Sequence, residues 1–251
     1  MELYLITGFL GAGKTTFLKN FARQFAGRRL RLIINEFGRA GVDGTLLREL
    51  DAALDEISNG SIFCACRLDQ FEAALEQAAA DAPDVVLVEA SGLADPTNVR
   101  RVLAQFPAVS YQGSVCVADA ARLEKVFSTA RACPRQLAVS SLVLLNKTDL
   151  ATEAQCAEAK ALILRANPAA RIRRTQFGRF EPEWLSLIVP DVDVDEVLDM
   201  PDITLQKAVL QIRPTMPFAA LQKCLVQLAG ETWRIKGFVR VPEGIFYVDC
   251  T

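Results

Sequence analysis

The chain has 251 residues, and 51% of them are apolar, which is enough for a substantial buried core and excludes a disordered or collagen-like protein. Its 28 lysines and arginines nearly balance 30 aspartates and glutamates, and the formal net charge of −2 predicts neither nucleic acid nor an anionic membrane surface as a partner. There is no histidine, so histidine-based catalytic triads and histidine metal ligands are excluded.

Short apolar runs alternate with amphipathic helical runs along the first two thirds of the chain. This alternation is typical of βαβ units and predicts an α/β fold with a mainly parallel sheet. Val85–Val88 and Leu142–Leu145 are apolar at every position, so we expect them inside the sheet with helices on both faces. The expected strands are Leu3–Thr7, Arg31–Ile34, Val85–Glu89, Ser114–Ala118, Leu142–Asn146 and Arg171–Thr175.

A glycine-rich loop follows the first expected strand. Residues Gly8 to Thr15 read GFLGAGKT, which matches the phosphate-loop pattern GxxxxGK[ST], and the helical run Thr16–Phe25 comes next. In such a loop the backbone N–H groups surround a phosphate, the lysine reaches the β- and γ-phosphates, and the threonine hydroxyl binds Mg²⁺. The pattern predicts a phosphate-loop NTPase with a three-layer sandwich. The nucleotide-binding residues expected here are Gly8, Gly11, Ala12, Gly13, Lys14, Thr15 and Thr16, with Thr15 also a Mg²⁺ ligand.

An acidic residue ends the expected strand Val85–Glu89. Ligands of parallel sheets bind at the carboxyl ends of the strands, so we expect Glu89 to hold Mg²⁺ directly or through water. In the segment that follows, Gly92 would offer its N–H to the γ-phosphate, and hydrolysis would then release this segment. Glu89, Gly92 and Lys14 are therefore candidate catalytic residues.

A candidate base-binding motif, Asn146-Lys147-Thr148-Asp149, follows another buried strand. The Asp149 carboxylate can accept hydrogen bonds from both N1–H and the exocyclic amine of guanine, a pair of donors that adenine lacks. The Lys147 stem can lie over the base, and Asn146 can either contact the base edge or brace the phosphate loop. We therefore expect GTP and GDP as ligands. The alternative, a small-molecule kinase on the same scaffold, would be favoured by a preference for ATP.

With Ile34-Asn35-Glu36-Phe37-Gly38, these motifs resemble those of the CobW-like GTPases, relatives of the UreG, HypB and MeaB metalloenzyme-maturation factors. The run Thr7–Thr16 (TGFLGAGKTT), the run Glu89–Pro96 (EASGLADP) and Arg234–Phe238 (RIKGF) extend the resemblance over nearly the whole chain. It implies a GTPase that hydrolyses GTP slowly and uses the nucleotide to control delivery of a metal or metallocofactor to a client metalloenzyme.

The resemblance also implies roles for residues of a first switch. Glu36 and Asp43 would help to order Mg²⁺ or the attacking water, and are further candidate catalytic residues. Arg39 could act as an arginine finger in cis, although an ordinary surface arginine is the favoured interpretation. A homodimer across the nucleotide face is a further expectation from the resemblance.

The expected transition-metal site departs from the family pattern. CobW-like proteins usually carry Cys-x-Cys-Cys after Asn-Gly, whereas alignment from Asn59-Gly60 places Ser61, Phe63 and Cys64 at those positions. Cys64 and Cys66 still offer two thiols on one side of an extended segment, and a carboxylate or client ligand would complete a tetrahedral site for Zn²⁺, Co²⁺ or Ni²⁺. The alternative is that these thiols bind no metal. The chain would then be a nucleotide-gated docking or reactivation partner of a metalloenzyme, for example a corrinoid protein.

The end of the chain is expected to form a second, smaller domain. Residues 190–203 contain six acidic residues and no lysine or arginine, and we interpret them as a linker after a GTPase domain of residues 1–189. Residues 204–251 would form a β-α-β-β appendage, similar to a truncated CobW C-terminal domain. Its expected elements are the strand Ala208–Ile212, the helix Phe218–Leu228, and a hairpin of Trp233–Val241 with Ile245–Asp249 around Pro242-Glu243-Gly244.

The sequence also indicates a compartment. No apolar run reaches the roughly 18 residues that span a membrane, and the apolar start Leu3–Leu10 is interrupted by Thr7 and Gly8 and has no basic stretch before it. The seven cysteines are odd in number and scattered, which fits free thiols in a reducing environment. We therefore expect a cytoplasmic protein.

Overall fold

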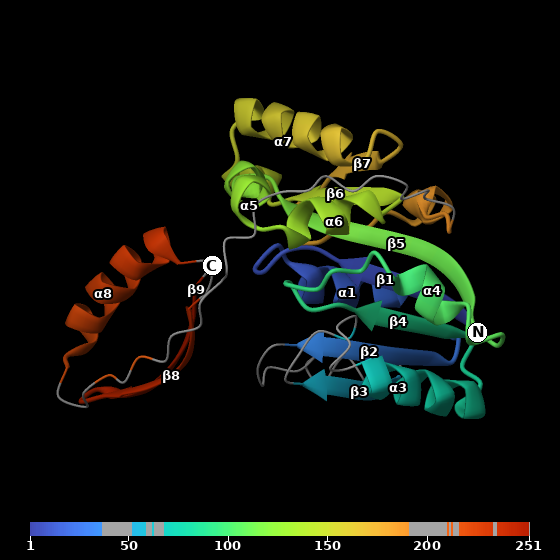
Figure 1. Cartoon of the computed structure of the whole chain (residues 1–251). Helices are drawn as coiled ribbons and strands as arrows, with labels where there is room; N and C mark the ends of the chain where they lie inside the picture. Colours follow the sequence, from blue (N-terminus) through green and yellow to red (C-terminus); the bar gives the residue numbers. More distant parts are fainter. Residues whose placement is uncertain are drawn as a thin grey trace. The chain divides into compact units, whose positions relative to one another are not determined.

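The computed structural model describes residues 1–36, 52–58, 62, 68–190, 210, 212, 216–232 and 235–250. The chain divides into two compact units, Met1–Ile203 and Thr204–Thr251. The first contains a seven-stranded sheet and the second a two-stranded sheet (Figure 1).

The sheet of the first unit confirms the expected parallel α/β fold. Its strand order is β3-β2-β4-β1-β5-β6-β7, and all six neighbouring pairs are parallel. The two runs expected in the sheet interior, β4 and β6, have a neighbour on each side and are buried at every position. The strands are β1 (Glu2–Thr7), β2 (Leu30–Glu36), β3 (Ala53–Ser58), β4 (Val85–Glu89), β5 (Ser110–Asp119), β6 (Leu142–Asn146) and β7 (Arg171–Arg174).

Helices cover both faces of this sheet, so the first unit has three layers (Figure 1). Alternate side chains of β1 enter two different cores: Tyr4 and Ile6 lie in one, Leu3 and Leu5 in the other. In the described part of the chain, no helix is long and apolar enough to cross a membrane. The α-helices are α1 (Lys14–Ala22), α3 (Leu68–Asp81), α4 (Val99–Leu103), α5 (Leu123–Thr129), α6 (Ala132–Ala138) and α7 (Glu153–Ala166), and the 3₁₀ turns are η1 (Arg23–Phe25), η2 (Thr148–Leu150) and η3 (Pro182–Leu187).

Aromatic packing fixes helix α1, which carries the end of the phosphate loop. Phe17 stacks on Phe21 with ring centroids 5.2 Å apart, and Phe21 meets Phe180 edge to face at 4.9 Å. Aromatic pairs of this kind contribute about 0.5–1.5 kcal/mol each beyond their buried area. The helix begins at Lys14, two residues earlier than expected, because Gly13 adopts a left-handed conformation and turns the chain directly into the helix.

Strand β3 was missed by the sequence analysis. Its sequence ALDEIS has adjacent acidic residues and no continuous apolar run, as suits an edge strand, which among the described strands pairs with β2 alone. The buried Arg31 of β2 compensates, since its Nε lies 2.6 Å from Asp55 Oδ2 of β3 and it also pairs with Asp81 of α3. An arginine that binds two carboxylates therefore holds this edge.

The second unit contains a helix and a hairpin: α8 (Phe218–Glu231), β8 (Ile235–Val241) and β9 (Gly244–Cys250). The expected turn is confirmed, with Gly244 at φ +147°, and the ring of Phe218 packs on that of Phe246 at 4.6 Å. Leu210 and Ile212 are the described residues of the expected strand 208–212, and both lie outside any strand. The rest of that strand, Trp233 and most of the expected acidic linker lie outside the described residues.

Candidate nucleotide-binding site

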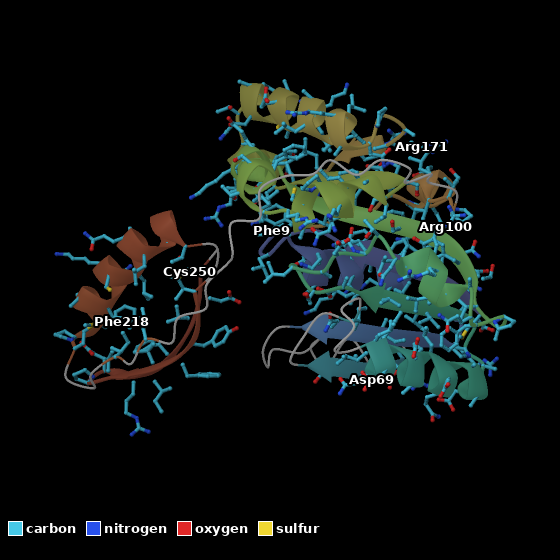
Figure 2. All side chains as sticks on the ribbon, viewed as in Figure 1. Phe9, Asp69, Arg100, Arg171, Phe218 and Cys250 are labelled. Atoms are coloured by element: carbon cyan, nitrogen blue, oxygen red, sulfur yellow. The ribbon has the colours of Figure 1, made fainter. Side chains whose placement is uncertain are left out.

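The sequence motifs of the first unit gather at one edge of the sheet. Because the strands are parallel, the loop after β1, Glu89 at the end of β4, Asp119 at the end of β5 and Asn146 at the end of β6 all lie at the carboxyl edge. In Figure 2, Phe9 marks the loop at this edge. Ligands of open parallel sheets bind at this place.

Glycines let the loop after β1 approach its neighbours closely. Gly8 has φ +132°, and a Cβ added to it would lie 2.2 Å from the carbonyl oxygen of Val117 in β5. Gly13 has φ +101°, and a Cβ there would lie 2.6 Å from Nδ2 of Asn146. Gly11 also has a positive φ of +74°. Any side chain at Gly8 or Gly13 would displace the loop, so the backbone itself forms the inner surface, as a phosphate cradle requires.

The loop lysine lies within this cradle. Lys14 is buried, and its Nζ donates a hydrogen bond to the carbonyl oxygen of Phe9 at 3.2 Å, which holds the side chain back over the loop. An ammonium group beside several backbone N–H groups is suited to an anionic ligand. The loop therefore fits the phosphates of a nucleotide.

Thr15 and Glu89 provide oxygen atoms beside the loop. Thr15 Oγ1 donates to Glu89 Oε1 at 3.0 Å, so the first turn of α1 contacts the end of β4. Glu89 is 6% exposed, and a carboxylate so well buried is best stabilised by a cation. Hydroxyl and carboxylate oxygens are the ligands that Mg²⁺ prefers, so this pair fits the expected Mg²⁺ site.

Asn146 connects the base motif to the phosphate loop. Its Nδ2 donates to the carbonyl oxygen of Ala12 at 2.9 Å, although the two residues are 134 positions apart, and its Oδ1 accepts from the N–H of Gly178 at 3.0 Å. Of the two roles expected for Asn146, the structure therefore shows the brace of the phosphate loop. The side chain joins three separate loops at the carboxyl edge.

The two charged residues of the base motif are arranged differently. Lys147 has φ +60°, and its Nζ lies 2.9 Å from Oδ2 of Asp119 at the end of β5. Asp149 lies in η2, and its carboxylate is exposed. The Lys147 side chain is thus held by an ion pair, while the Asp149 side chain remains accessible to a nucleotide base. Asp119 was missed by the sequence analysis, although its place at the end of an expected parallel strand could have indicated it.

The segment Thr175–Gly178 after β7 was not expected at the site, and Thr175, expected as the last residue of the strand, lies just beyond it. The carbonyl oxygen of Thr175 accepts hydrogen bonds from both the N–H and the hydroxyl of Thr148, at 3.4 and 3.1 Å. Asn20 Nδ2 donates to the carbonyls of Phe177 and Gly178 at 3.1 and 2.9 Å. This segment therefore packs between the base motif and α1. The only available sequence signal was its position after the last expected strand.

Asn35, at the end of β2, connects β3 to the segment that follows Glu89. Its Nδ2 donates to the carbonyl oxygen of Ile57 at 3.1 Å, and its Oδ1 accepts from the N–H groups of Ile62 at 3.0 Å and Ser91 at 3.4 Å. Gly92 lies next to the phosphate loop, because a Cβ on it would be 2.7 Å from the backbone nitrogen of Leu10. The segment after Glu89 therefore packs directly against the phosphate loop.

Several expected site residues lie outside the described part of the chain. They include the side chain of Glu36 and the residues Arg39, Asp43, Asn59, Gly60, Ser61, Phe63, Cys64 and Cys66. The described residues contain no group of three or more Cys, Asp or Glu that could hold a metal ion. Among the described cysteines, Cys116, Cys133 and Cys156 are buried, and burial raises the pKa of the Cys116 thiol to about 12. That thiol stays protonated near neutral pH and is a core side chain.

Comparison with known proteins identifies a family and a shared fold. Residues 2–174 match the family described as CobW/HypB/UreG, nucleotide-binding domain. The zinc-bound structure of the YjiA GTPase from Escherichia coli has the same fold, with a TM-score of 0.56 at 18% identity over 99% of this chain and 88% of that chain. The hydrogenase maturation factor HypB from Archaeoglobus fulgidus gives a TM-score of 0.50 at 21% identity, over 74% of this chain and 87% of that one.

Curated relatives are also similar in sequence. The zinc chaperone CobW of Pseudomonas aeruginosa is 32% identical over 206 residues, which are 68% of this chain and 55% of the relative. The zinc chaperone YjiA of Escherichia coli is 26% identical over 226 residues, which are 86% of this chain and 66% of the relative. The chain therefore spans between about half and two thirds of the length of these relatives.

Proposed function

The chain belongs to the CobW/HypB/UreG family of nucleotide-binding domains, and from this premise we propose that it binds GTP with Mg²⁺, hydrolyses it slowly to GDP and phosphate, and assists metal or metallocofactor insertion into a client metalloenzyme. Relatives named zinc chaperones support the metal role. One of these relatives, YjiA, has a structure with bound zinc.

One observation carries the nucleotide part of this proposal. Asn146 of the base motif donates to the Ala12 carbonyl in the phosphate loop at 2.9 Å, and this contact supports a single site that includes both motifs. A nucleotide has its phosphates and its base at opposite ends, and the site offers the loop to one end and the exposed Asp149 to the other. An aspartate that accepts from two guanine donors favours GTP over ATP.

The chemistry requires positioning and charge stabilisation. Water attacks the γ-phosphorus, the bond from that phosphorus to the β-bridging oxygen breaks, and GDP leaves with the electron pair of that bond. Lys14 and the backbone N–H groups of Gly11 to Lys14 would stabilise the negative charge on the phosphate oxygens, and Gly92 would add its N–H at the γ-phosphate. Mg²⁺, held by Thr15 and Glu89, supplies further charge neutralisation when bound. Glu36 and Asp43 would orient the attacking water.

A Lys14→Ala substitution tests the proposed hydrolysis. The variant should lose GTP turnover, measured as phosphate release at saturating GTP, because no other side chain of the loop carries a positive charge. Lys19→Ala is the matched control, because it removes a lysine from the same helix outside the loop and should leave turnover unchanged. Unchanged turnover in the Lys14 variant would exclude the assignment.

The metal part of the proposal depends on Cys64 and Cys66. Two thiolates with a carboxylate or a client ligand would hold Zn²⁺, Co²⁺ or Ni²⁺ as cargo rather than as a resident cofactor. The second candidate function is nucleotide-gated docking to a client metalloenzyme or corrinoid protein without binding free metal. It is favoured by the departure of Ser61 and Phe63 from the cysteine pattern of the family.

A further inference from the structure

Gln136 of α6 contacts the segment that follows Glu89. This side chain is 1% exposed, and its Nε2 donates hydrogen bonds to the carbonyl oxygens of Gly92 at 3.2 Å and Ala94 at 2.9 Å. An amide NH₂ has two hydrogens, so both are used on this one segment. The reverse orientation of the amide would place its oxygen against two carbonyl oxygens, so the two contacts themselves define which end faces the segment.

The neighbouring residue of α6 holds the same segment. Arg135 Nη1 pairs with Asp95 Oδ2, and Asp95 Oδ1 accepts hydrogen bonds from the N–H and hydroxyl of Thr97 at 3.2 and 2.7 Å. Consecutive side chains of a single helix therefore fix three positions of the segment. None of these contacts involves the phosphate loop or the base motif.

The peptide between Ser91 and Gly92 is held on both sides. The N–H of Ser91 lies 3.4 Å from Asn35 Oδ1, and the carbonyl of Gly92 is bound by Gln136. The N–H of Gly92 belongs to the peptide between these two contacts. It is buried, and within the described ranges it donates no hydrogen bond. A backbone N–H that donates to no described residue is available to an oxygen of a bound ligand.

We propose that Gln136 is a positioning residue for the γ-phosphate: it holds the Gly92 peptide so that the Gly92 N–H meets a γ-phosphate oxygen, and it thereby makes the site prefer GTP to GDP. The inference rests on the proposed function, because it requires a guanine nucleotide in the phosphate loop. The close approach of Gly92 to Leu10 places this peptide beside that loop. Loss of the Gln136 contacts would affect only the nucleotide that has a γ-phosphate.

A purely structural role for Gln136 has a different consequence, and Asn167 provides the comparison. Asn167, at the end of α7, also has a buried side-chain amide, and its Nδ2 donates to the carbonyls of Leu137 and Ser140 at 3.1 and 2.9 Å. Leu137 is in the last turn of α6 and Ser140 follows the helix, and neither carbonyl belongs to the segment after Glu89. A substitution of Asn167 therefore removes comparable hydrogen bonds at the end of α6 without releasing Gly92.

The test measures the affinities of GDP and of a non-hydrolysable GTP analogue for the full chain with Gln136→Met and Asn167→Leu, together with kcat and KM for GTP. Gln136→Met should weaken binding of the analogue about tenfold, which corresponds to the free energy of one net hydrogen bond. It should change GDP affinity by no more than about twofold, and it should lower kcat. Asn167→Leu should leave the ratio of the two affinities unchanged. Arg135→Gln should shift the ratio of analogue affinity to GDP affinity in the same direction by a smaller factor. This variant tests the inference if Gln136→Met does not fold.

The outcomes separate the inference from the proposed function. A wild-type ratio in a folded Gln136→Met that still binds GDP would overturn the inference. An equal shift in the Asn167 variant would also overturn it, because the effect would then be structural. A wild-type protein that binds neither nucleotide would overturn the proposed function itself, and the inference with it.

Discussion

At the residue scale, two side chains of the base motif have separate tasks. Asn146 is buried and uses both ends of its amide on the backbone, at Ala12 and Gly178. Its removal would disturb the loops on either side. Asp149 is exposed and is available to a ligand. A change at Asp149 therefore alters base selection without altering the loop that binds the phosphates.

Asp149→Asn should change the base selectivity of the site from guanine to xanthine. Guanine presents two donors, N1–H and the exocyclic amine, whereas xanthine presents an oxygen in place of the amine, to which an asparagine NH₂ can donate. We expect GDP affinity to fall about 100-fold and XDP affinity to rise above it, as measured by competition with a fluorescent nucleotide. Glu158→Gln, an exposed acid on α7, should behave as wild type. Unchanged GDP binding in the Asp149 variant would show that another group reads the base.

At the scale of elements, the loop between β1 and α1 depends on its close contact with β5. The loop is confined on one side by the Val117 carbonyl, next to Gly8, and on the other by Asn146, next to Gly13. Aromatic packing of Phe17 and Phe21 fixes the helix at the end of the loop. The loop geometry is therefore set by contacts with distant strands, and a small added volume should displace it.

Gly8→Ala should abolish nucleotide binding, because its Cβ would lie 2.2 Å from the Val117 oxygen at a φ of +132°. The control is Gly27→Ala, where φ is also positive, at +84°, and a Cβ would meet no atom within 4 Å. That control isolates the backbone strain of about 1–2 kcal/mol that a side chain pays in the left-handed region. GDP titration and thermal unfolding of both variants measure the difference. If both variants lost the same stability and kept nucleotide affinity, the contact with β5 would be unimportant.

At the scale of the whole molecule, the nucleotide site and the expected metal segment are joined through Asn35. This side chain binds the N–H of Ser91, beside Gly92, and the N–H of Ile62, two residues before Cys64 in the sequence. A shift of the segment after Glu89 on binding GTP would therefore be transmitted to the backbone that precedes the cysteines. Reciprocal coupling is required thermodynamically, so metal would also alter the affinity for GTP.

Zinc affinity should consequently depend on the nucleotide. Titration of Zn²⁺ into protein loaded with GDP or with a non-hydrolysable GTP analogue should give stoichiometric binding with affinities that differ at least fivefold. Cys64→Ser, Cys66→Ser should abolish this binding. The thiol of Cys116 does not compete, since burial raises its pKa to about 12. Equal binding in both nucleotide states would remove the coupling, and no binding above the double variant would favour the docking role.

The sequence by itself determined those strands, helices and loops whose signals lie within a few neighbouring residues. The continuous apolar runs of β4 and β6 predicted buried strands, and GFLGAGKT predicted a loop before a helix, because both signals depend on spacing within a few positions. The edge strand β3 was not predicted, since its acidic residues are stabilised by Arg31, which lies 24 positions from Asp55. Its stability depends on a contact that no local period reveals.

The tertiary structure alone decided how these parts meet. No local pattern in the sequence specifies the strand order, and it is the order β4-β1-β5-β6 that brings Glu89 to Thr15 and Asn146 to Ala12. Gln136 carried no sequence signal at all, because a glutamine in a short helix is ordinary until its partners are known. Hydrogen bonds between residues far apart in the chain depend on the packing of whole strands and helices, and this packing is a property of the fold as a unit rather than of any segment.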